Sequence, residues 1–287
     1  MMSRKKYETY FLIGPATLLF AGLVATPLAM TLILSLNDWS ATRGIISVIT
    51  FKNYVEIFSD GYFAGIFLRT LRISLWVTLV CVLIGAPEAY ILRRMRQPWR
   101  SICIFVVIGP LLVSVVARTL GWALLLYPDG IVSRALQIVG LASGPVSLMF
   151  TETGVIIALV HVLCPFMVLA VWASLSRMDP AVERAAQSLG AGPFTAFRRV
   201  VLPQAMPGIL SGSIIVFSLA ASAFATPAII GGRRLKVAST LAYDEFLNTL
   251  NWPLGASVAM LLLLGIVATV IGCNRYVERH YAQVFAS

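Results

Sequence analysis

Two ionisable side chains lie inside long hydrophobic stretches of this sequence, and they are the first candidates for chemistry. Glu88 and Arg118 have apolar residues on both sides, and charged groups in such surroundings are costly and usually serve a function. Glu88 lies one or two helical turns before the arginines of residues 93–96, so it either pairs with one of them or contacts a cation. Arg118 shares a helix face with Trp122, and it either lines an outer mouth or extends to the outer membrane surface.

Two further groups of residues nearer the C-terminus have side chains or backbone suited to binding. Tyr243 and Glu245 belong to an acidic and aromatic patch, which either attracts a cation or a basic protein rim or is simply solvated. Phe224 and Thr226, next to Pro227, are expected to interrupt a helix near its outer end. Backbone carbonyls freed by such an interruption can face a cavity.

Motifs of the common enzyme classes are absent from the sequence. There is no GxxxxGK[ST] phosphate loop, no GxSxG nucleophile elbow and no HExxH zinc site. We expect His161 and His280, which stand apart from each other, to be packed or solvated side chains. The cysteines are spaced singly, so neither a disulfide framework nor a metal site is indicated; they are Cys81, Cys103, Cys164 and Cys273. We therefore expect no cofactor in this chain, and any ATP is expected to be hydrolysed by a partner.

The composition is that of a membrane protein. Hydrophobic residues make up 59% of the 287 residues and charged residues 12%, with a mean hydropathy of +0.89; soluble domains carry about 25% charged residues. A helix of about 20 apolar residues crosses a bilayer, and six runs of that kind occur, at about 11–36, 73–92, 102–127, 154–175, 209–230 and 254–273. The sequence predicts an all-α integral membrane protein with six transmembrane helices, forming a single domain over residues 1–287.

The distribution of Lys and Arg predicts the orientation of these helices. Most of them fall in the N-terminal segment, the loops after the second and fourth runs, and the C-terminal segment. Short cytoplasmic loops retain positive charge, so both termini are expected in the cytoplasm. The net charge of +10 is explained by this topology and by contact with membrane lipid. Nucleic-acid binding is not expected, because no basic soluble domain is present.

Residues 176–208 form a polar segment between the fourth and fifth runs, and they predict two short helices. Asp179 is a suitable N-cap, Pro180 a first helical residue and Gly190 a C-terminal stop. One face of the first helix carries apolar residues at helical spacing, namely Val182, Ala185, Ala186 and Leu189. The second helix is expected to begin at Pro193 and end at Pro203, with Phe194 on its apolar side. These helices either lie on lipid or dock into a partner protein.

The polar segment resembles the signature loop of the permease subunits of type I ABC importers. That signature reads EAA, three residues, Gly, nine residues and I-x-LP, and the same spacing is occupied here by Arg184, Ala185, Ala186, Gly190, Val200, Leu202 and Pro203. Arg184 stands where Glu is usual, with Glu183 directly before it. In this family the loop is the coupling helix that docks into the ATP-hydrolysing subunit. The residues that the resemblance assigns to this coupling are Glu183, Arg184, Ala185, Ala186, Leu189, Gly190, Phe194, Leu202 and Pro203.

The resemblance implies the type I ABC importer permease fold in a bacterial inner membrane. It also implies three kinds of partner: a homologous second permease, two cytoplasmic ATPases that bind ATP and Mg²⁺, and a periplasmic or lipid-anchored substrate-binding protein. The stretches "ARTLGW" at 117–122, "FATPAIIGGRRLKV" at 224–237 and "NWPLGAS" at 251–257 are similar to the polyamine branch. Relatives of that branch carry iron, opines or phosphonates, so these substrates remain alternatives. The competing classes are a secondary transporter driven by an ion gradient and a membrane-bound enzyme.

Overall fold

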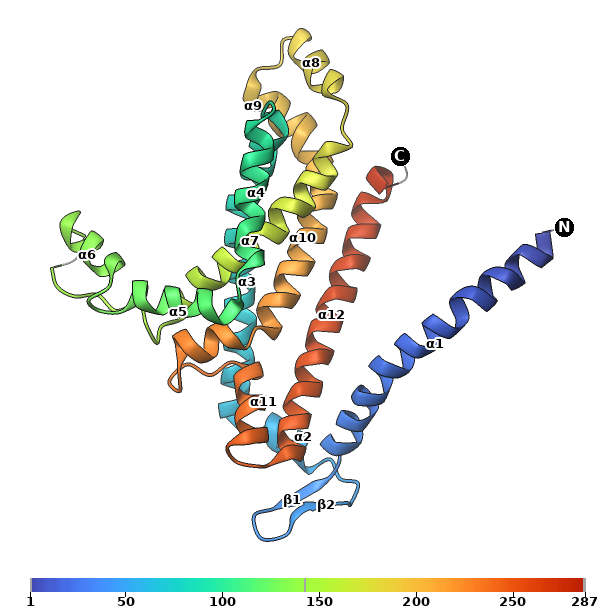
Figure 1. Ribbon diagram of the computed structural model, residues 1–287, viewed down its shortest axis with the longest axis vertical. Helices are drawn as coiled ribbons and strands as arrows, with labels where there is room; N and C mark the ends of the chain where they lie inside the picture. Colours follow the sequence, from blue (N-terminus) through green and yellow to red (C-terminus); the bar gives the residue numbers. More distant parts are fainter. Residues whose placement is uncertain (1, 142, 286–287) are drawn as a thin grey trace. The chain divides into compact units, whose positions relative to one another are not determined.

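The computed structural model describes residues 2–141 and 143–285, and helices account for nearly all of them (Figure 1). Six of these helices are long and apolar enough to cross a membrane, in the described part of the chain. The chain divides into two compact units. One comprises residues 1–64 and 241–263, the other residues 65–240 and 264–287, so that the division falls within three of the helices.

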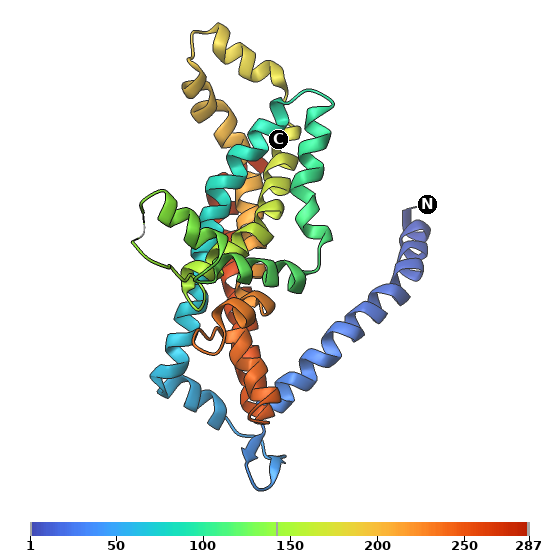
Figure 2. The same cartoon turned by 60° about the vertical axis from the view of Figure 1, so that its left-hand side comes forward.

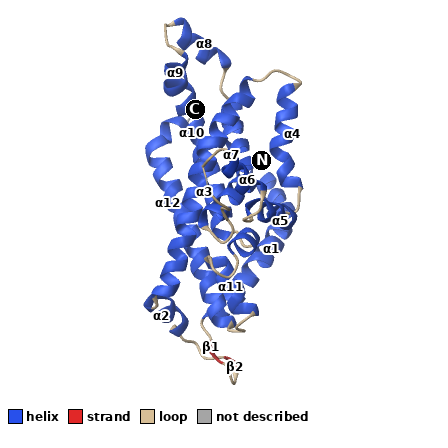
Figure 3. Ribbon diagram, turned by 90° about the vertical axis from the view of Figure 1, so that its left-hand side faces the viewer, coloured by secondary structure: helices blue, strands red, loops and turns tan. Residues whose placement is uncertain are grey.

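The first unit contains the N-terminal helix and a short hairpin. Its elements are α1 (Met2–Ser35), β1 (Asp38–Ser40), β2 (Gly44–Ile46) and α2 (Lys52–Ser59), with the first turn of α3 and the adjoining parts of α11 and α12. The two strands pair antiparallel, with Trp39 opposite Ile45 (Figure 3). The buried side chain of Asn53 donates hydrogen bonds to the carbonyls of Ser35 and Asn37, at 3.0 and 2.8 Å. These bonds join the end of α1 to α2 and satisfy carbonyls that a helix end leaves open.

The second unit contains the main helical bundle. Its elements are α3 (Gly61–Arg94), α4 (Trp99–Leu112), α5 (Val115–Leu126), α6 (Ile131–Ile138), α7 (Glu152–Ser176), α8 (Pro180–Ser188), α9 (Pro193–Ala196), the π-helical turn η1 (Phe197–Val201), α10 (Leu202–Ser222), the π-helical turn η2 (Pro227–Gly231), the start of α11 (Ala238–Leu247) and the later part of α12 (Trp252–Phe285).

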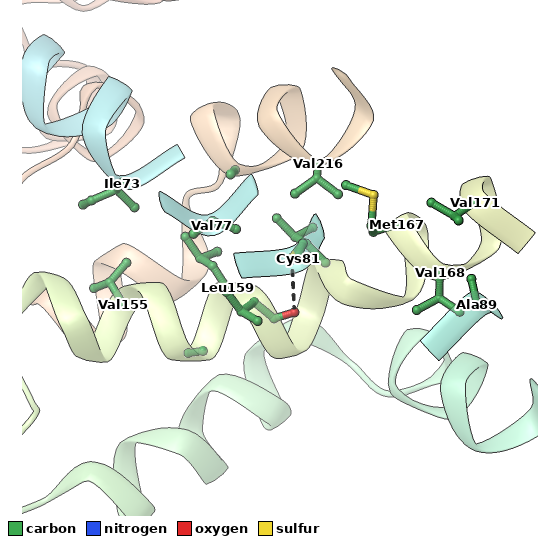
Figure 4. Packing of buried hydrophobic residues seen from close by; sticks show 14 of the residues in the cluster. Ile73, Val77, Cys81, Ala89, Val155, Leu159, Met167, Val168, Val171 and Val216 are labelled. Atoms are coloured by element: carbon green, nitrogen blue, oxygen red, sulfur yellow. Dashed lines mark hydrogen bonds between the residues drawn. The ribbon is translucent and has the colours of Figure 1, made fainter. Parts of the chain in front are cut away.

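Helix α7 is the centre of this bundle. In the most apolar 18-residue window of α7, 61% is buried inside the protein. The corresponding windows of the other candidate spans are 33% buried or less. Val77 and Cys81 of α3 and Val216 of α10 pack against Leu159 and Met167 of α7 (Figure 4). The close approach of α7 and α10 depends on glycine. A Cβ atom at Gly208 would lie 2.7 Å from the carbonyl oxygen of Ala170, which is closer than side-chain atoms approach.

The predicted span at 102–127 is not a single helix. It is divided at Val113, which is extended, and Ser114, which is also non-helical, between α4 and α5. Pro110 has no backbone N–H and disturbs the last turn of α4, which ends at Leu112. Helix α4 follows the direction of α7, whereas α5 runs across it (Figures 1 and 2). The single crossing helix expected at these residues was therefore wrong.

Helix α3 begins earlier than the predicted Ile73. Its first turns include Arg69 and Arg72, which a hydropathy count excludes from an apolar run. Both arginines form ion pairs with Glu152 at the start of α7, with 3.4 Å between Arg69 Nε and the carboxylate. Pairing lowers the cost of holding these charges close to the apolar part of the bundle, and the helix extends beyond the hydrophobic run.

Candidate functional site

The segment between α7 and α10, residues 177–201, is built as two short helices. Asp179 caps α8 by accepting a hydrogen bond from the backbone N–H of Ala181, at 2.8 Å. Gly190 follows α8 with a φ of 88°, a conformation that glycine adopts at little cost. The predicted cap and stop of this helix are confirmed, as is Pro193 at the first turn of α9. We call residues 177–201 the coupling segment.

The second helix of the coupling segment does not end at Pro203. The π-helical turn Phe197–Val201 leads directly into α10, and Pro203 lies in the first turn of α10. In the wide turn the N–H of Leu202 bonds to the carbonyl of Phe197, five residues back. In a regular α-helix the ring of a proline clashes with the carbonyl four residues before it. The five-residue spacing of a π-helical turn moves that carbonyl relative to the ring, so proline is tolerated there. The helical stretch from Pro193 to Ser222 is therefore continuous over 30 residues.

Helix α8 has its acidic residue turned inward and its apolar residues turned outward. Glu183 is 8% exposed, whereas Leu189 is 89% and Phe194, at the start of α9, is 75% exposed. Arg184, Ala185 and Ala186 lie between them, the first two exposed and the third half-buried. Large apolar side chains at such exposures mark a contact surface when they are grouped.

Three residues of α3 hold Glu183 in place. The Tyr90 hydroxyl donates a hydrogen bond to its carboxylate at 2.9 Å, and the Arg94 guanidinium forms a close ion pair with the same oxygen. Arg93 lies 3.9 Å from the other carboxylate oxygen and also donates to the carbonyl of Met178 at 3.2 Å. The Arg94 guanidinium covers the Tyr90 ring at 4.6 Å, and Phe197 of η1 packs edge-on against that ring at 5.2 Å.

We call the contacts of Tyr90, Arg93 and Arg94 with Glu183 the anchor of the coupling segment. The sequence did not predict this anchor, and its arginine contacts correct one hypothesis. Glu88 was expected to pair with one of the arginines at 93–96, yet the first two of these pair with Glu183 instead. Glu88 is half-buried and forms no hydrogen bond or ion pair with residues 2–141 and 143–285. One available signal was that Glu183 is the only acid of the coupling segment besides the helix cap Asp179, in a segment that carries four arginines.

Arg118 is bonded within the protein. Its guanidinium donates to the carbonyl of Pro110, which faces the break between α4 and α5, and its buried Nε atom has no partner among the described residues. Trp122, one turn further along α5, donates a hydrogen bond from Nε1 to His161 Nδ1 of α7, at 3.1 Å.

The interruption predicted near Phe224 occurs at Ala223 and Phe224, between α10 and the turn that leads into η2. The carbonyl of Ala223, one of those freed by the interruption, accepts a hydrogen bond from the Ser239 hydroxyl, at 2.6 Å. Thr226 is buried and lies 3.2 Å from the hydroxyl of Thr119 on α5. These contacts fix η2 against α5 by paired polar groups.

The acidic and aromatic patch lies on α11, in the first unit. Tyr243 is 45% exposed. Glu245 is half-buried, and its carboxylate accepts a hydrogen bond from Thr249 at 2.6 Å. The patch is thus exposed in part and bonded locally.

A family model described as "Binding-protein-dependent transport system inner membrane component" matches residues 79–282, which include the coupling segment. The chain belongs to this family. It is a transmembrane permease subunit of an ABC importer, and it catalyses no reaction itself, since an ATPase partner carries out hydrolysis in this family.

Two named homologues support this assignment. The spermidine/putrescine transport system permease protein PotB of Haemophilus influenzae is 34% identical over 212 residues, 74% of each chain. PotB of Escherichia coli strain K12 is 31% identical over 225 residues, 78% of this permease and 82% of the relative.

Solved structures show the same fold. A chain of a bacterial alginate ABC transporter, in complex with an alginate pentasaccharide-bound periplasmic protein, superimposes with a TM-score of 0.79 over 96% of both chains at 17% identity. A chain of the MetNI methionine ABC transporter gives a TM-score of 0.57 over 74% of this permease and 93% of that chain, also at 17% identity. The permease therefore has the type I ABC importer fold, as the sequence predicted.

Proposed function

We propose that this permease pairs with a homologous second permease, two cytoplasmic ATPases that bind ATP and Mg²⁺, and an external substrate-binding protein. The proposed solute is a polyamine or a related small cationic or amino-acid-like molecule, because the PotB relatives are named for spermidine and putrescine. The proposed location is a bacterial inner membrane with both termini in the cytoplasm, which the distribution of Lys and Arg supports.

The observation that carries the coupling role is the exposure of α8 and α9. Leu189 and Phe194 project from the coupling segment while Glu183 is turned inward. A helix that merely covered the protein would bury its leucine and expose its glutamate. Ala185 is small and exposed, which allows another surface to approach the helix backbone closely. We assign this surface to a cleft of the ATPase, with Leu189 and Phe194 as the apolar anchors.

The contacts behind the coupling segment suit it to transmit force. Glu183 joins α8 to the end of α3, Arg93 joins the carbonyl of Met178 to the same end, and Ser174 of α7 donates to the carbonyl of Gln204 at 2.9 Å. A displacement of α8 therefore acts on α3, α7 and α10 together, as a rigid body. In this mechanism ATP binding closes the ATPases, the coupling segments open the outer side of the permease pair, and hydrolysis resets it.

Gradient-driven secondary transport, the competing class weighed from the sequence, does not fit the family to which the chain belongs. Glu88, which is half-buried and lacks a described partner, is therefore not needed as an ion-coupling site. We expect Glu88→Gln to leave ATP-driven uptake intact.

The deciding experiment reconstitutes the permease with its co-purifying partners in vesicles. Uptake of radiolabelled spermidine and, separately, of radiolabelled ornithine is measured with and without ATP, with and without the binding protein, and in the presence of a protonophore. We expect uptake to need both ATP and the binding protein and to persist with the protonophore. Uptake that needs no ATP and stops with the protonophore would reject the importer assignment.

A further inference from the structure

His161 is the one exposed residue of α7 between Gly154 and Trp172. Every other residue of that stretch of the central helix is buried or half-buried. His161 lies nine residues beyond Glu152, so it is about 14 Å along the helix from its start. The hydrocarbon core of a bilayer is about 30 Å thick. A polar side chain is therefore exposed close to the middle of the membrane.

Trp122 fixes the chemical state and orientation of this imidazole. Its indole N–H donates to Nδ1, and the two rings meet edge-on with centroids 5.5 Å apart. Because Nδ1 accepts this bond, the proton of the neutral ring is on Nε2, which is then a donor. None of the described residues accepts a hydrogen bond from Nε2.

Arg118 lies one turn before Trp122 on the same face of α5. One guanidinium nitrogen of Arg118 donates a hydrogen bond to the carbonyl of Pro110. The buried Nε atom of Arg118 lacks a partner among the described residues. The cluster of Arg118, Trp122 and His161 therefore presents hydrogen-bond donors and one positive charge. An acceptor oxygen, and a carboxylate above all, complements such a set.

Hydrocarbon cannot cover this cluster at low cost, because an unpaired donor in lipid loses its hydrogen bond to water. The exposed face of His161 must therefore meet water or a polar group. We propose that His161 and Trp122 line the solute path and that His161 Nε2 donates a hydrogen bond to a carboxylate of the passing solute. This inference rests on the proposed importer function and narrows the solute class to amino-acid-like cations over simple polyamines.

Water access to the site can be tested with single cysteines in the assembled, reconstituted importer. The four native cysteines are replaced by alanine, and His161→Cys is compared with Leu83→Cys. Leu83 is a matched control because it is 64% exposed and lies two residues after Cys81, whose thiol contacts the carbonyl of Val160 at 3.9 Å. The anionic reagent MTSES reacts only with thiols that water reaches. We expect it to label the His161 variant and not the Leu83 variant, and an unlabelled His161→Cys would overturn the proposal.

The carboxylate is tested with ornithine and putrescine, which differ by that group alone. We expect ornithine to compete with labelled solute for uptake at least fivefold better than putrescine in the protein that retains His161, and we expect His161→Leu to abolish this preference. Equal competition by both in the unmodified protein, or a preference that survives His161→Leu, would reject the carboxylate contact. As a second measurement, His161→Leu should raise the KM for ornithine uptake about tenfold, while His161→Gln, which keeps an acceptor for Trp122 and a donor, should raise it less.

These results separate the inference from the function on which it rests. If uptake depends on ATP and the binding protein but His161 is unlabelled or its variants transport normally, the importer assignment stands and the site assignment fails. If the chain assembles with no ATPase, the proposed function fails regardless of the labelling.

Discussion

The hydroxyl of Tyr90 on α3 donates a hydrogen bond to the carboxylate of Glu183 on α8, across 2.9 Å. These residues are 93 positions apart in the chain, and their contact fastens the coupling segment to the end of a long apolar helix. The glutamate also pairs with two neighbouring arginines and so reduces the repulsion between their charges. This anchor makes the coupling segment a rigid part of the permease.

Replacing Glu183 by Gln should separate ATP hydrolysis from transport. Loss of the charge leaves the nearly buried Arg93 without its ion-pair partner and loosens α8, at a cost of about 1 to 3 kcal/mol of folding free energy. We expect uptake to fall at least tenfold while the ATPase still co-purifies and hydrolyses ATP. The measurement is the ratio of solute transported to ATP hydrolysed in vesicles.

Two variants serve as comparisons for the Glu183 result. Tyr90→Phe removes only the hydroxyl, so it should lower the free energy of unfolding by about 1 kcal/mol. Its loss of uptake should be smaller than that of Glu183→Gln. Ser188→Ala changes an exposed side chain of α8 that is outside the coupling residues, and it should transport normally. A loss with Ser188→Ala equal to that with Glu183→Gln would show that the contacts of Glu183 are not decisive.

Ala185→Glu should prevent docking of the ATPase without unfolding the permease. Ala185 is exposed on α8, so the larger charged side chain finds space in the free permease and obstructs only a partner surface. We expect normal membrane insertion, lost co-purification of the ATPase and no uptake. Gln187→Glu places the same charge on another exposed position of α8 and should retain uptake. Full co-purification with Ala185→Glu would contradict the docking surface.

Gly190→Asp should weaken the same contact by a different route. The φ of 88° at Gly190 is unfavourable for residues with a Cβ, so an aspartate costs about 1 kcal/mol and lets the C-terminal turn of α8 fray. We expect the protein to reach the membrane and uptake to be lost. Limited proteolysis of the coupling segment checks the fraying, and cleavage rates equal to those of the unmodified protein would refute it.

Gly208→Ala should destabilise the packing of α7 against α10. The new Cβ would lie 2.7 Å from the carbonyl oxygen of Ala170, and forced separation of packed helices costs about 1 to 3 kcal/mol. Thermal unfolding of the detergent-solubilised protein should show a lower midpoint. Gly265→Ala is the control, because nothing lies within 4 Å of its Cβ position, and its midpoint should stay equal or rise.

The β1–β2 hairpin should loosen in acid. Asp38 accepts a hydrogen bond from Lys52 at 3.0 Å, and this bond and that from the N–H of Trp39 lower the pKa of the Asp38 carboxyl. A lowered pKa in the folded state means that the stabilisation is present above the ordinary aspartate pKa of about 3.9 and is lost as the pH falls through the folded value. As the pH falls below the ordinary aspartate pKa, hydrogen exchange of the hairpin amides should accelerate relative to that of other amides. Asp38→Asn should remove this dependence on pH.

Local signals in the sequence predicted much of this permease. Asp179, Gly190 and Pro193 act within one or two turns of their own position, so their residue types alone indicated where the short helices begin and end. Continuous apolar runs likewise indicated the crossing helices, because the bilayer thickness sets a minimum length.

Contacts between distant residues could not be predicted in this way. The partners of Glu183 lie on another helix, and nothing in the sequence around residue 183 distinguishes Arg93 and Arg94 from the other arginines. The break after Leu112 leaves an apolar stretch on both sides, so hydropathy alone gives no sign that the chain changes direction there, and Pro110 was the one local signal of it. At Pro203 the proline rule gave the wrong result, because a π-helical turn outside its assumptions precedes the ring.

The uninterrupted helical stretch from Pro193 to Ser222 limits the changes in chain length that this region can tolerate. A single residue inserted between Phe194 and Gly208 would rotate one end of that rod by about 100° relative to the other and shift it by about 1.5 Å. Phe194 would then face away from the proposed ATPase cleft, or Gly208 away from Ala170. Insertions and deletions in this stretch would therefore be tolerated less well than substitutions, because they put its two ends out of phase.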